Sequence, residues 1–306
     1  MNKKLIIGTR GSKLSLAYAK KVIDLILKFN PEIKKDIVIK TIKTSGDMFL
    51  NKNISEIGGK HLFCKEIEDK LINNKIDIAV HSLKDMDSVE TKGLSINAYI
   101  KRNDPRETFV SKKDIKLSEL NNAKVGSSSR RRELQIKLIN KNITVENIRG
   151  NIDTRIKKVE EGKYDGAILA LAGLQTLKLE KYVKEKLEVK HFIPAAGQGI
   201  IAVQCRDEDA KTINILKKIN HTETRICALA ERNFLKVIGG DCQTAVGCLA
   251  TLRNNGIELC AQLFSDDGKK VFNVTKSGKS IDAEMVGKLA GEEILKKSGD
   301  NFKKRK

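Results

Sequence analysis

The sequence predicts an α/β protein with mainly parallel sheets, followed by a small α+β domain. Short apolar runs rich in branched residues alternate with segments of helical apolar periodicity, as in β-α-β units. Polar residues and glycines follow several of these runs directly, where open α/β sheets bind ligands. Near the end of the chain, Arg253-Asn-Asn-Gly256 joins two alternating runs, which predicts a hairpin there.

Length and composition indicate a globular protein of two or three domains, because the chain has 306 residues and 40% of them are hydrophobic. No stretch approaches the roughly 18 apolar residues of a membrane span. Residues 1–4 lead into a strand and not into a signal-peptide apolar region. We therefore expect a cytoplasmic protein without a membrane partner. The six cysteines lack the spacing of a disulfide framework or a zinc site, so no metal is expected.

The net charge of +20 would fit a nucleic-acid-binding protein. Most of the excess is lysine, however, which is spread evenly and ends in Lys303-Lys-Arg-Lys306. This pattern favours solubility and attracts anions in general. No nucleic-acid-binding motif accompanies it, so no nucleic-acid partner is expected. Arginine differs, because five of thirteen arginines fall between residues 130 and 155.

The first hundred residues predict one parallel-sheet unit. A strand at 5–7 precedes a Gly-containing turn, and Ser12 is a suitable N-cap for a helix that runs to about Phe29. A strand, a turn and a helix N-terminus together form an anion site, in which Arg10 and Ser12 lie. For Ser12 alone, simple capping is the preferred explanation. The further elements expected are a strand at 37–42, a mobile loop at 46–60, a helix at 61–73, and strands at 76–80 and 93–100.

Polar side chains follow the strand at 76–80 within one residue. In open α/β sheets ligands lie outside the carboxyl ends of strands, so Lys84 and Asp85 are expected at the mouth of a ligand site. Taken alone, the segment is better explained as a solvated loop with a Lys-Asp pair. The polar residues are His81, Ser82, Lys84, Asp85 and Asp87.

A second α/β unit is expected after a crossing at 101–107. Arg130-Arg-Arg132 lies in the first turns of a helix that Ser127-Ser-Ser opens, where cations are electrostatically unfavourable. That cost is reasonable if the site binds anions, because Arg forks hold carboxylates by two-point contacts. A solvated surface cluster is the weaker explanation, since lysine serves that purpose elsewhere. The other elements expected are strands at 124–126, 143–148 and 164–169, and a helix at 152–161 that carries Arg155 and follows Arg149.

The remaining chain is expected to return to the first unit and then form the small domain. Cys242 lies in a loop that follows Gly239-Gly240, and an exposed loop thiol is either incidental or reactive. The spacing does not decide between these two. The cysteines expected to be buried packing residues are Cys205, Cys227 and Cys260. The elements expected are strands at 200–204, 245–252, 257–264 and 270–275, and helices at 207–219, 222–237 and 281–297.

Eight motifs together resemble the hydroxymethylbilane synthase (porphobilinogen deaminase) family. In this order, over residues 6–247, they are highly specific. The motifs are Gly8-Thr-Arg-Gly-Ser12, Gly58-Gly-Lys-His-Leu-Phe63, Ala79-Val-His-Ser-Leu-Lys-Asp85, Gly126-Ser-Ser-Ser-Arg-Arg-Arg132, Ile148-Arg-Gly-Asn-Ile-Asp-Thr-Arg155, Leu169-Ala-Leu-Ala-Gly-Leu174, Pro194-Ala-Ala-Gly-Gln-Gly199 and Gly239-Gly-Asp-Cys-Gln243.

The resemblance implies a fold of two periplasmic-binding-protein-like doubly wound domains with a double crossover, plus a small C-terminal α+β domain. Domain 1 is expected at 1–100 with 200–219, domain 2 at 101–199 and domain 3 at 220–306. A cleft between the first two domains is implied, with the cofactor loop reaching in from the third.

The resemblance also implies a transferase of tetrapyrrole (porphyrin and heme) biosynthesis. Four porphobilinogen molecules would be joined head to tail with loss of ammonia, and hydroxymethylbilane would be released. A dipyrromethane cofactor would be held by a thioether to Cys242. Asp85 matches the catalytic aspartate, which assists departure of the amine and stabilises the resulting cation. The implied protein is a monomer that passes its product to uroporphyrinogen-III synthase.

The resemblance implies that the arginines bind carboxylates, because each pyrrole carries acetate and propionate groups. The implied cofactor-binding residues besides Cys242 are Lys84, Ser82, Ser128, Ser129, Arg131, Arg132 and Arg155. The implied substrate-binding residues are Arg10, Ser12, Arg149, Arg155 and Lys60.

The sequence departs from the family pattern at four positions. Asp87 stands where proline is common, and Asp241 stands where a small residue is common. Arg130 replaces a usually apolar residue, and Glu56 lies in a loop that often carries lysine. These departures are expected to affect the rate and the loop, not the reaction.

The alternative is a non-catalytic, two-lobed anion-binding protein of the periplasmic type. The arginines and the double crossing would suit it equally well. The absence of a signal-peptide pattern, Asp85 placed among cations, and Cys242 argue against it.

Overall fold

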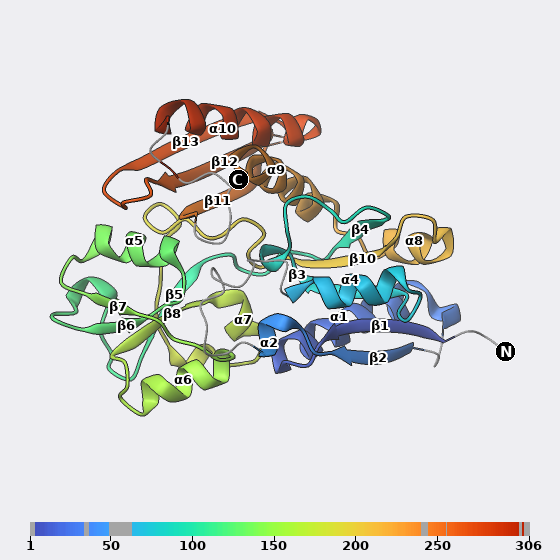
Figure 1. The fold of residues 1–306 in the computed structure, drawn as a ribbon, viewed down its shortest axis with the longest axis horizontal. Helices are drawn as coiled ribbons and strands as arrows, with labels where there is room; N and C mark the ends of the chain where they lie inside the picture. Colours follow the sequence, from blue (N-terminus) through green and yellow to red (C-terminus); the bar gives the residue numbers. More distant parts are fainter. Residues whose placement is uncertain are drawn as a thin grey trace. The chain divides into compact units, whose positions relative to one another are not determined.

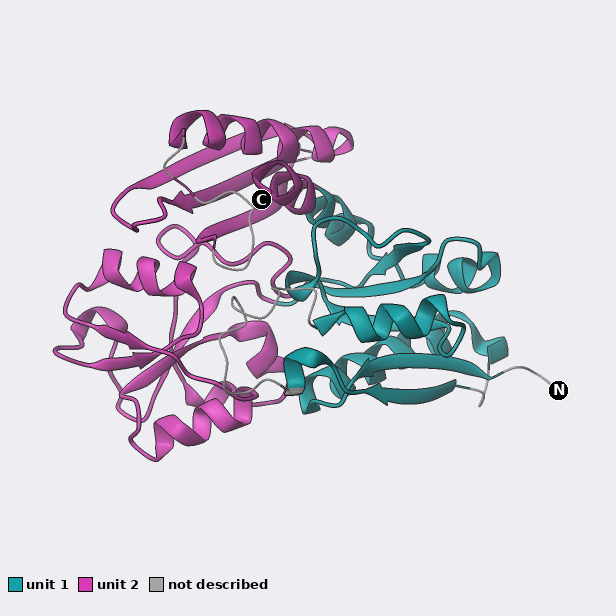
Figure 2. Cartoon of the chain, in the orientation of Figure 1, with its two compact units in different colours: residues 1–103, 200–229 teal, residues 104–199, 230–306 magenta. Residues whose placement is uncertain are grey.

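The computed structural model describes residues 4–33, 37–48, 63–239, 244–254, 256–299 and 302 (Figure 1). The chain forms two compact units (Figure 2). One comprises Met1–Asn103 with Ile200–Leu229, and the other comprises Asp104–Gly199 with Ala230–Lys306. The chain therefore passes back and forth between the units, as the double crossover predicted. The division into three domains remains a prediction.

The sheet of the first unit has the strand order β2-β1-β3-β10-β4. β1 runs parallel to both of its neighbours, whereas β10 is antiparallel to β3 and β4. The strands are β1 (Leu5–Arg10), β2 (Ile37–Ile42), β3 (Ile78–Ser82), β4 (Leu94–Tyr99) and β10 (Ile201–Arg206). The described α-helices that lie wholly within this unit are α1 (Lys13–Phe29), α2 (Ser45–Met48), α4 (Lys65–Ile72) and α8 (Ala210–Lys217).

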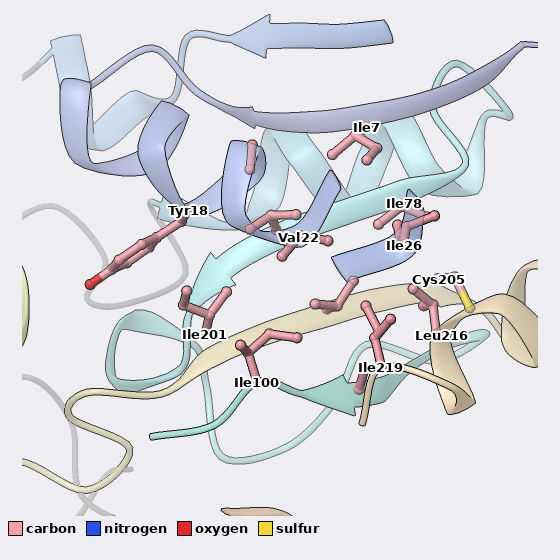
Figure 3. Packing of buried hydrophobic residues seen from close by; sticks show 14 of the residues in the cluster. Ile7, Tyr18, Val22, Ile26, Ile78, Ile100, Ile201, Cys205, Leu216 and Ile219 are labelled. Carbon is pink, nitrogen blue, oxygen red and sulfur yellow. The ribbon is translucent and has the colours of Figure 1, made fainter. Parts of the chain in front are cut away.

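The apolar core of this unit lies between α1 and the sheet. Figure 3 shows Val22 and Ile26 of α1 beside Ile7 and Ile78 from β1 and β3, and Ile201 from β10 belongs to the same cluster. Ser12 caps α1, because its Oγ accepts a hydrogen bond from the Ser15 N–H at 3.2 Å. The capping interpretation of Ser12 is therefore confirmed.

The second unit contains a similar five-stranded sheet in the order β7-β6-β8-β5-β9. β6 is parallel to β7 and β8, and β5 is antiparallel to β8 and β9. The strands are β5 (Glu107–Ser111), β6 (Lys124–Gly126), β7 (Thr144–Glu146), β8 (Gly166–Ala170) and β9 (Val183–Lys186). The helices near this sheet are α5 (Arg130–Ile139), α6 (Ile152–Glu160) and α7 (Leu171–Thr176).

The predicted C-terminal α+β fold is confirmed. Its antiparallel sheet has the order β11-β12-β13. Helix α10 packs closely on α9, because Gly287 of α10 has no side chain at the point of contact. A Cβ at Gly287 would lie 2.1 Å from the Ala230 carbonyl oxygen. The elements are α9 (Thr222–Ile238), β11 (Val246–Arg253), β12 (Gly256–Phe264), β13 (Val271–Lys279) and α10 (Ala283–Ser298). Short 3₁₀ helices are η1 (Pro31–Ile33), η3 (Leu83–Asp85), η4 (Leu117–Glu119), η5 (Glu180–Tyr182) and η6 (Ser280–Asp282).

Three details of the fold were not predicted correctly or not predicted at all. Residues 45–48 form α2, although a loop was expected from 46; residues 49–60 lie outside the described part of the chain. β5, β9 and α7 were missed. Cys205 and Cys227 are buried as expected, but Cys260 is only half-buried.

Within the described ranges, no helix is long and apolar enough to cross a membrane.

Candidate active site

The carboxyl ends of β1 and β3 bring several of the predicted residues to one edge of the first sheet. The two strands are parallel, with Ile7 opposite Ile78 and Gly8 opposite Ala79. Arg10 at the end of β1 and Ser82 at the end of β3 therefore leave the sheet at the same edge. The two strands run further than expected, so Arg10 and Ser82 end them and do not follow them. Both residues still lie at the sheet edge where open α/β sheets bind ligands.

Asp85 is presented by a short turn with two apolar anchors. Leu83 and Met86 are 3% and 4% exposed, whereas Lys84 and Asp85 between them are half-buried. The Leu83 N–H donates to the Ile200 carbonyl oxygen at 3.0 Å, and the Met86 N–H donates to the Leu83 carbonyl oxygen at 3.1 Å. The anchors and hydrogen bonds fix the backbone, so the turn that carries Lys84 and Asp85 is held in place after β3.

A buried polar network lies at the base of this turn. His81 Nε2 donates to Gln204 Oε1 at 3.2 Å, and Gln204 Nε2 donates to Glu68 Oε1 at 2.9 Å. Thr91 Oγ1 donates to Glu68 Oε2 at 2.7 Å. Burial lowers the pKa of His81 from 6.5 to about 4, although the charges of Glu68 and Asp85 and the bond to Gln204 act in the opposite direction. His81 is therefore a neutral donor at physiological pH.

Cys64 supports the same turn from the side of α4. Its Sγ lies 3.7 Å from the Asp85 carbonyl oxygen, within reach of a weak S–H hydrogen bond. Burial raises the pKa of this thiol well above its usual value, and the negative charges of Glu68, Asp85 and Asp87 raise it further. Cys64 therefore stays a thiol and does not supply a nucleophile.

Arg10 is held at the same edge by a carboxylate and an aromatic ring. Its Nη2 donates to Asp47 Oδ1 at 2.5 Å, and its Cζ lies 4.3 Å from the centre of the Phe63 ring. Asp47 was not predicted from the sequence, although the segment that carries it, Thr44-Ser-Gly-Asp47, begins two residues after the end of β2.

Serines of the second unit lie at the matching edge of its sheet. Ser129 caps α5, and its Oγ is 3.5 Å from the Arg132 backbone N. Ser128 is exposed, with its Oγ 2.5 Å from Asn147 Oδ1 and 2.6 Å from the Ile148 carbonyl oxygen. β6 and β7 are parallel neighbours, so these serines and the residues after β7 leave the sheet together.

Arg131 and Arg132 are buried and share one carboxylate, Glu107. Glu107 Oε1 accepts from Arg131 Nη2 at 2.6 Å and from Arg132 Nε at 2.9 Å, and Oε2 accepts from Arg132 Nη2 at 2.7 Å. The three residues are 5%, 8% and 0% exposed in the order Arg131, Arg132, Glu107. Two cations and one anion leave a net positive charge at the start of α5.

Glu107 offsets the free-energy cost of burying the two guanidinium charges of Arg131 and Arg132. Burial lowers the pKa of Arg131, the charge of Glu107 raises it, and the neighbouring Arg132 lowers it again. Arg131 Nη1 also donates to Gln135 Oε1 and to the Ile193 carbonyl oxygen, both at 2.9 Å. Buried charges are tolerated when they are paired and hydrogen-bonded in this way.

Arg149 and Arg155 flank a tight turn between β7 and α6. Gly150 has φ +109, a backbone conformation that favours glycine. Its carbonyl oxygen accepts from Arg155 Nε at 2.8 Å, and the Arg149 carbonyl oxygen accepts from Lys158 Nζ at 3.1 Å. The turn therefore gathers three cationic side chains near the N-terminus of α6, where the helix dipole also favours an anion.

Comparison with known proteins shows the family of the chain. Residues 5–214 match the family model described as "Porphobilinogen deaminase, dipyromethane cofactor binding domain". Residues 225–296 match the "Porphobilinogen deaminase, C-terminal domain". The chain belongs to the porphobilinogen deaminase family. The resemblance seen in the sequence is thereby confirmed.

Relatives named porphobilinogen deaminase are similar over almost the whole chain. The Syntrophomonas wolfei protein is 40% identical over 96% of this chain and 96% of its own length. The Brevibacillus brevis protein is 42% identical over 94% of this chain and 93% of its own length. Among solved structures, a Bordetella pertussis BvgS VFT2 domain has a TM-score of 0.44 at 14% identity, covering 71% of this chain and 85% of that domain.

The porphobilinogen deaminase motifs pointed to Asp85 and to the cations, but they did not reveal the carboxylates that pair with or support those residues. Lys60 and Cys242 lie outside the described residues, so their surroundings are not on view. Glu68, Asp47 and Glu107 were missed. Glu107 had a visible signal, because it is the one charged residue in Glu107-Thr-Phe-Val-Ser111, a strand that is otherwise apolar or weakly polar. The two buried arginines beside it, Arg131 and Arg132, also require a buried counter-charge.

Replacing Glu107 with glutamine is expected to destabilise the protein strongly. Glu107→Gln leaves two buried guanidinium groups without their carboxylate, a change that costs about 3–5 kcal/mol in comparable buried pairs. Urea unfolding followed by circular dichroism measures it. Glu161→Gln is the control, because that carboxylate pairs with Lys163 on the surface. Equal, small shifts of the unfolding midpoint in both variants would show that the bonds of Glu107 to Arg131 and Arg132 stabilise the fold no more than a surface ion pair does.

His81 is expected to remain neutral throughout the physiological pH range. The unfolded chain takes up a proton as the pH falls through 6.5, whereas the folded protein does so only near 4. Stability should therefore fall between those two values as acid is added. The imidazole ¹⁵N shifts of His81 report its charge directly. A midpoint near 6.5 in the folded protein, equal to that in urea, would contradict the assignment.

Proposed function

We propose that this chain is a hydroxymethylbilane synthase, which joins four porphobilinogen molecules and releases ammonia and hydroxymethylbilane. The main support is the placement of Asp85 in an anchored turn at the sheet edge, inside a chain of the porphobilinogen deaminase family. A protein that only bound anions would have little use for a fixed carboxylate beside Lys84, because that carboxylate repels its ligand.

Asp85 is proposed as the catalytic carboxylate. When the C–N bond of the substrate aminomethyl group breaks, ammonia leaves with the electron pair and positive charge remains on the pyrrole. A fixed carboxylate stabilises that charge without having to reorient. The carboxylate then accepts the ring proton after the new carbon–carbon bond forms. The hydrogen bonds that fix Leu83 and Met86 hold the acid in place for these successive roles.

The described residues fit a dipyrromethane group, because the donors at the sheet edges are ammonium, guanidinium and hydroxyl groups. These are the natural partners of the carboxylates that the pyrroles carry. When bound, the group supplies the free pyrrole carbon to which the first substrate is joined. We assign its attachment to Cys242. The residues proposed to hold its carboxylates are Ser82, Lys84, Ser128, Ser129, Arg131, Arg132 and Arg155.

Arg131 and Arg132 differ from the other proposed cofactor ligands in their burial. Most of their donor groups already bond Glu107 and backbone carbonyl oxygens. Their proposed contribution is therefore the excess positive charge of the cluster, together with the few N–H groups that remain beside α5. The substrate carboxylates are assigned to Ser12, to the half-buried Arg10, Arg149 and Arg155, and to Lys60, which lies outside the described residues.

We further propose that the protein acts as a monomer in the cytoplasm and passes its product to uroporphyrinogen-III synthase. The support is the family resemblance, since hydroxymethylbilane synthases supply that next reaction with its substrate.

Replacing Asp85 with asparagine is expected to remove at least about 100-fold of the turnover, because a positioned acid–base group contributes that much or more. The assay follows ammonia release and tetrapyrrole formation from porphobilinogen. Asp87→Asn is the matched control, two residues along the chain, and should retain turnover. Full activity in Asp85→Asn would refute the catalytic assignment. An inactive wild-type protein that carries its cofactor would refute the proposed function.

A further inference from the structure

The guanidinium group of Arg10 is held by Asp47 along one edge and by the Phe63 ring over one face. Asp47 occupies one edge, since Nε lies 3.4 Å from Oδ2 and Nη2 lies 2.5 Å from Oδ1. The Phe63 ring covers one face at 4.3 Å from Cζ. The Arg10 side chain is still 22% exposed. Within the described part of the chain, the edge formed by Nη1 and the second Nη2 hydrogen is the one left to meet a ligand.

Asp47 is itself held firmly. Its Oδ2 accepts from the Thr44 N–H at 3.3 Å and from Thr44 Oγ1 at 2.8 Å, and Thr44 is fully buried. Burial alone would raise the pKa of Asp47, but its bonds to Arg10 and Thr44 lower the pKa below the usual value. The carboxylate is therefore charged and fixed near neutral pH, whatever ligand is present.

The aromatic support is equally specific. Gly46 lies directly under the Phe63 ring, and a Cβ at this position would come within 2.2 Å of the ring. Phe63 thus packs on the backbone beside Asp47, so the two supports of Arg10 form one structure. The next residue, Cys64, contacts the Asp85 turn. Arg10 and Asp85 are in this way supported by neighbouring residues of one segment.

We propose that Asp47 is a positioning residue, which together with Phe63 orients Arg10 so that its outer edge receives a carboxylate of porphobilinogen. The inference rests on the proposed function and deepens it. A flexible arginine loses side-chain freedom when it binds, and this loss weakens affinity. An arginine that is already ordered avoids that loss. Two-point binding of a carboxylate also requires the guanidinium plane to be set correctly.

The opposite role, in which Asp47 competes with the substrate for Arg10, predicts the opposite result. A competitor would have to occupy the edge that the ligand uses, and removing it would tighten binding. Asp47 occupies the Nε edge and leaves the outer edge, so the geometry points to orientation.

The test compares Asp47→Asn with the wild-type enzyme, both loaded with cofactor. We expect KM for porphobilinogen to rise about three- to tenfold, the effect of ordering one long side chain on binding, while kcat changes less than about twofold. Phe63→Leu should shift KM in the same direction, because it removes the second support. A purely structural defect would lower the unfolding midpoint and the active fraction, without this separation of KM from kcat.

Asp104→Asn is the matched control. Asp104 forms the same kind of two-point pair with Arg106, at distances of 2.8–3.2 Å and similar exposure, and its pKa is lowered in the same way. The Asp104→Asn substitution removes the same negative charge as Asp47→Asn and should leave KM unchanged. An unchanged or lowered KM in Asp47→Asn, or an equal rise in Asp104→Asn, would overturn the inference. Both outcomes are measured against an active wild-type enzyme, so they would leave the proposed function intact. A wild-type enzyme that carries its cofactor and is still inactive would instead refute the proposed function.

Discussion

The burial of Leu83 and Met86 on either side of Asp85 is the constraint on which the candidate site depends. The two apolar side chains hold the turn down, so the polar pair between them must face outward. The hydrogen bond from Leu83 to Ile200 ties the turn to the segment that leads into β10, a strand from much later in the chain. A catalytic carboxylate needs this kind of fixed backbone, because electrostatic stabilisation works only when the charge does not have to move.

In each unit, buried or half-buried carboxylates set the positions of neighbouring arginines. Glu107 holds Arg131 and Arg132, and Asp47 holds Arg10. In both places an arginine fork grips a protein carboxylate in the way that it would grip a ligand. The protein thus keeps positive charge in well-defined positions, with enough negative charge nearby to make its burial tolerable.

Local patterns in the sequence located most of the elements, because periodicity and turn signals are local properties. Local patterns placed Ser12, Arg10 and Asp85 near strand ends, but the catalytic role of Asp85 came from the family resemblance. The pairing of Glu107 with Arg131 and Arg132 joins residues 24 and 25 positions apart, so no local pattern contains it. The Gln204–Glu68 bond spans 136 positions. β9 was missed because Val183–Lys186 is rich in lysine and has little apolar content to mark it as a strand.

The intact mass of the purified protein, followed by a peptide map around Cys242, is the most direct test of the account. We predict that the mass exceeds the 34.1 kDa of the chain by two linked pyrrole units, and that the excess lies on the Cys242 peptide. An unmodified protein that neither gains mass nor releases ammonia when porphobilinogen is added would contradict the account.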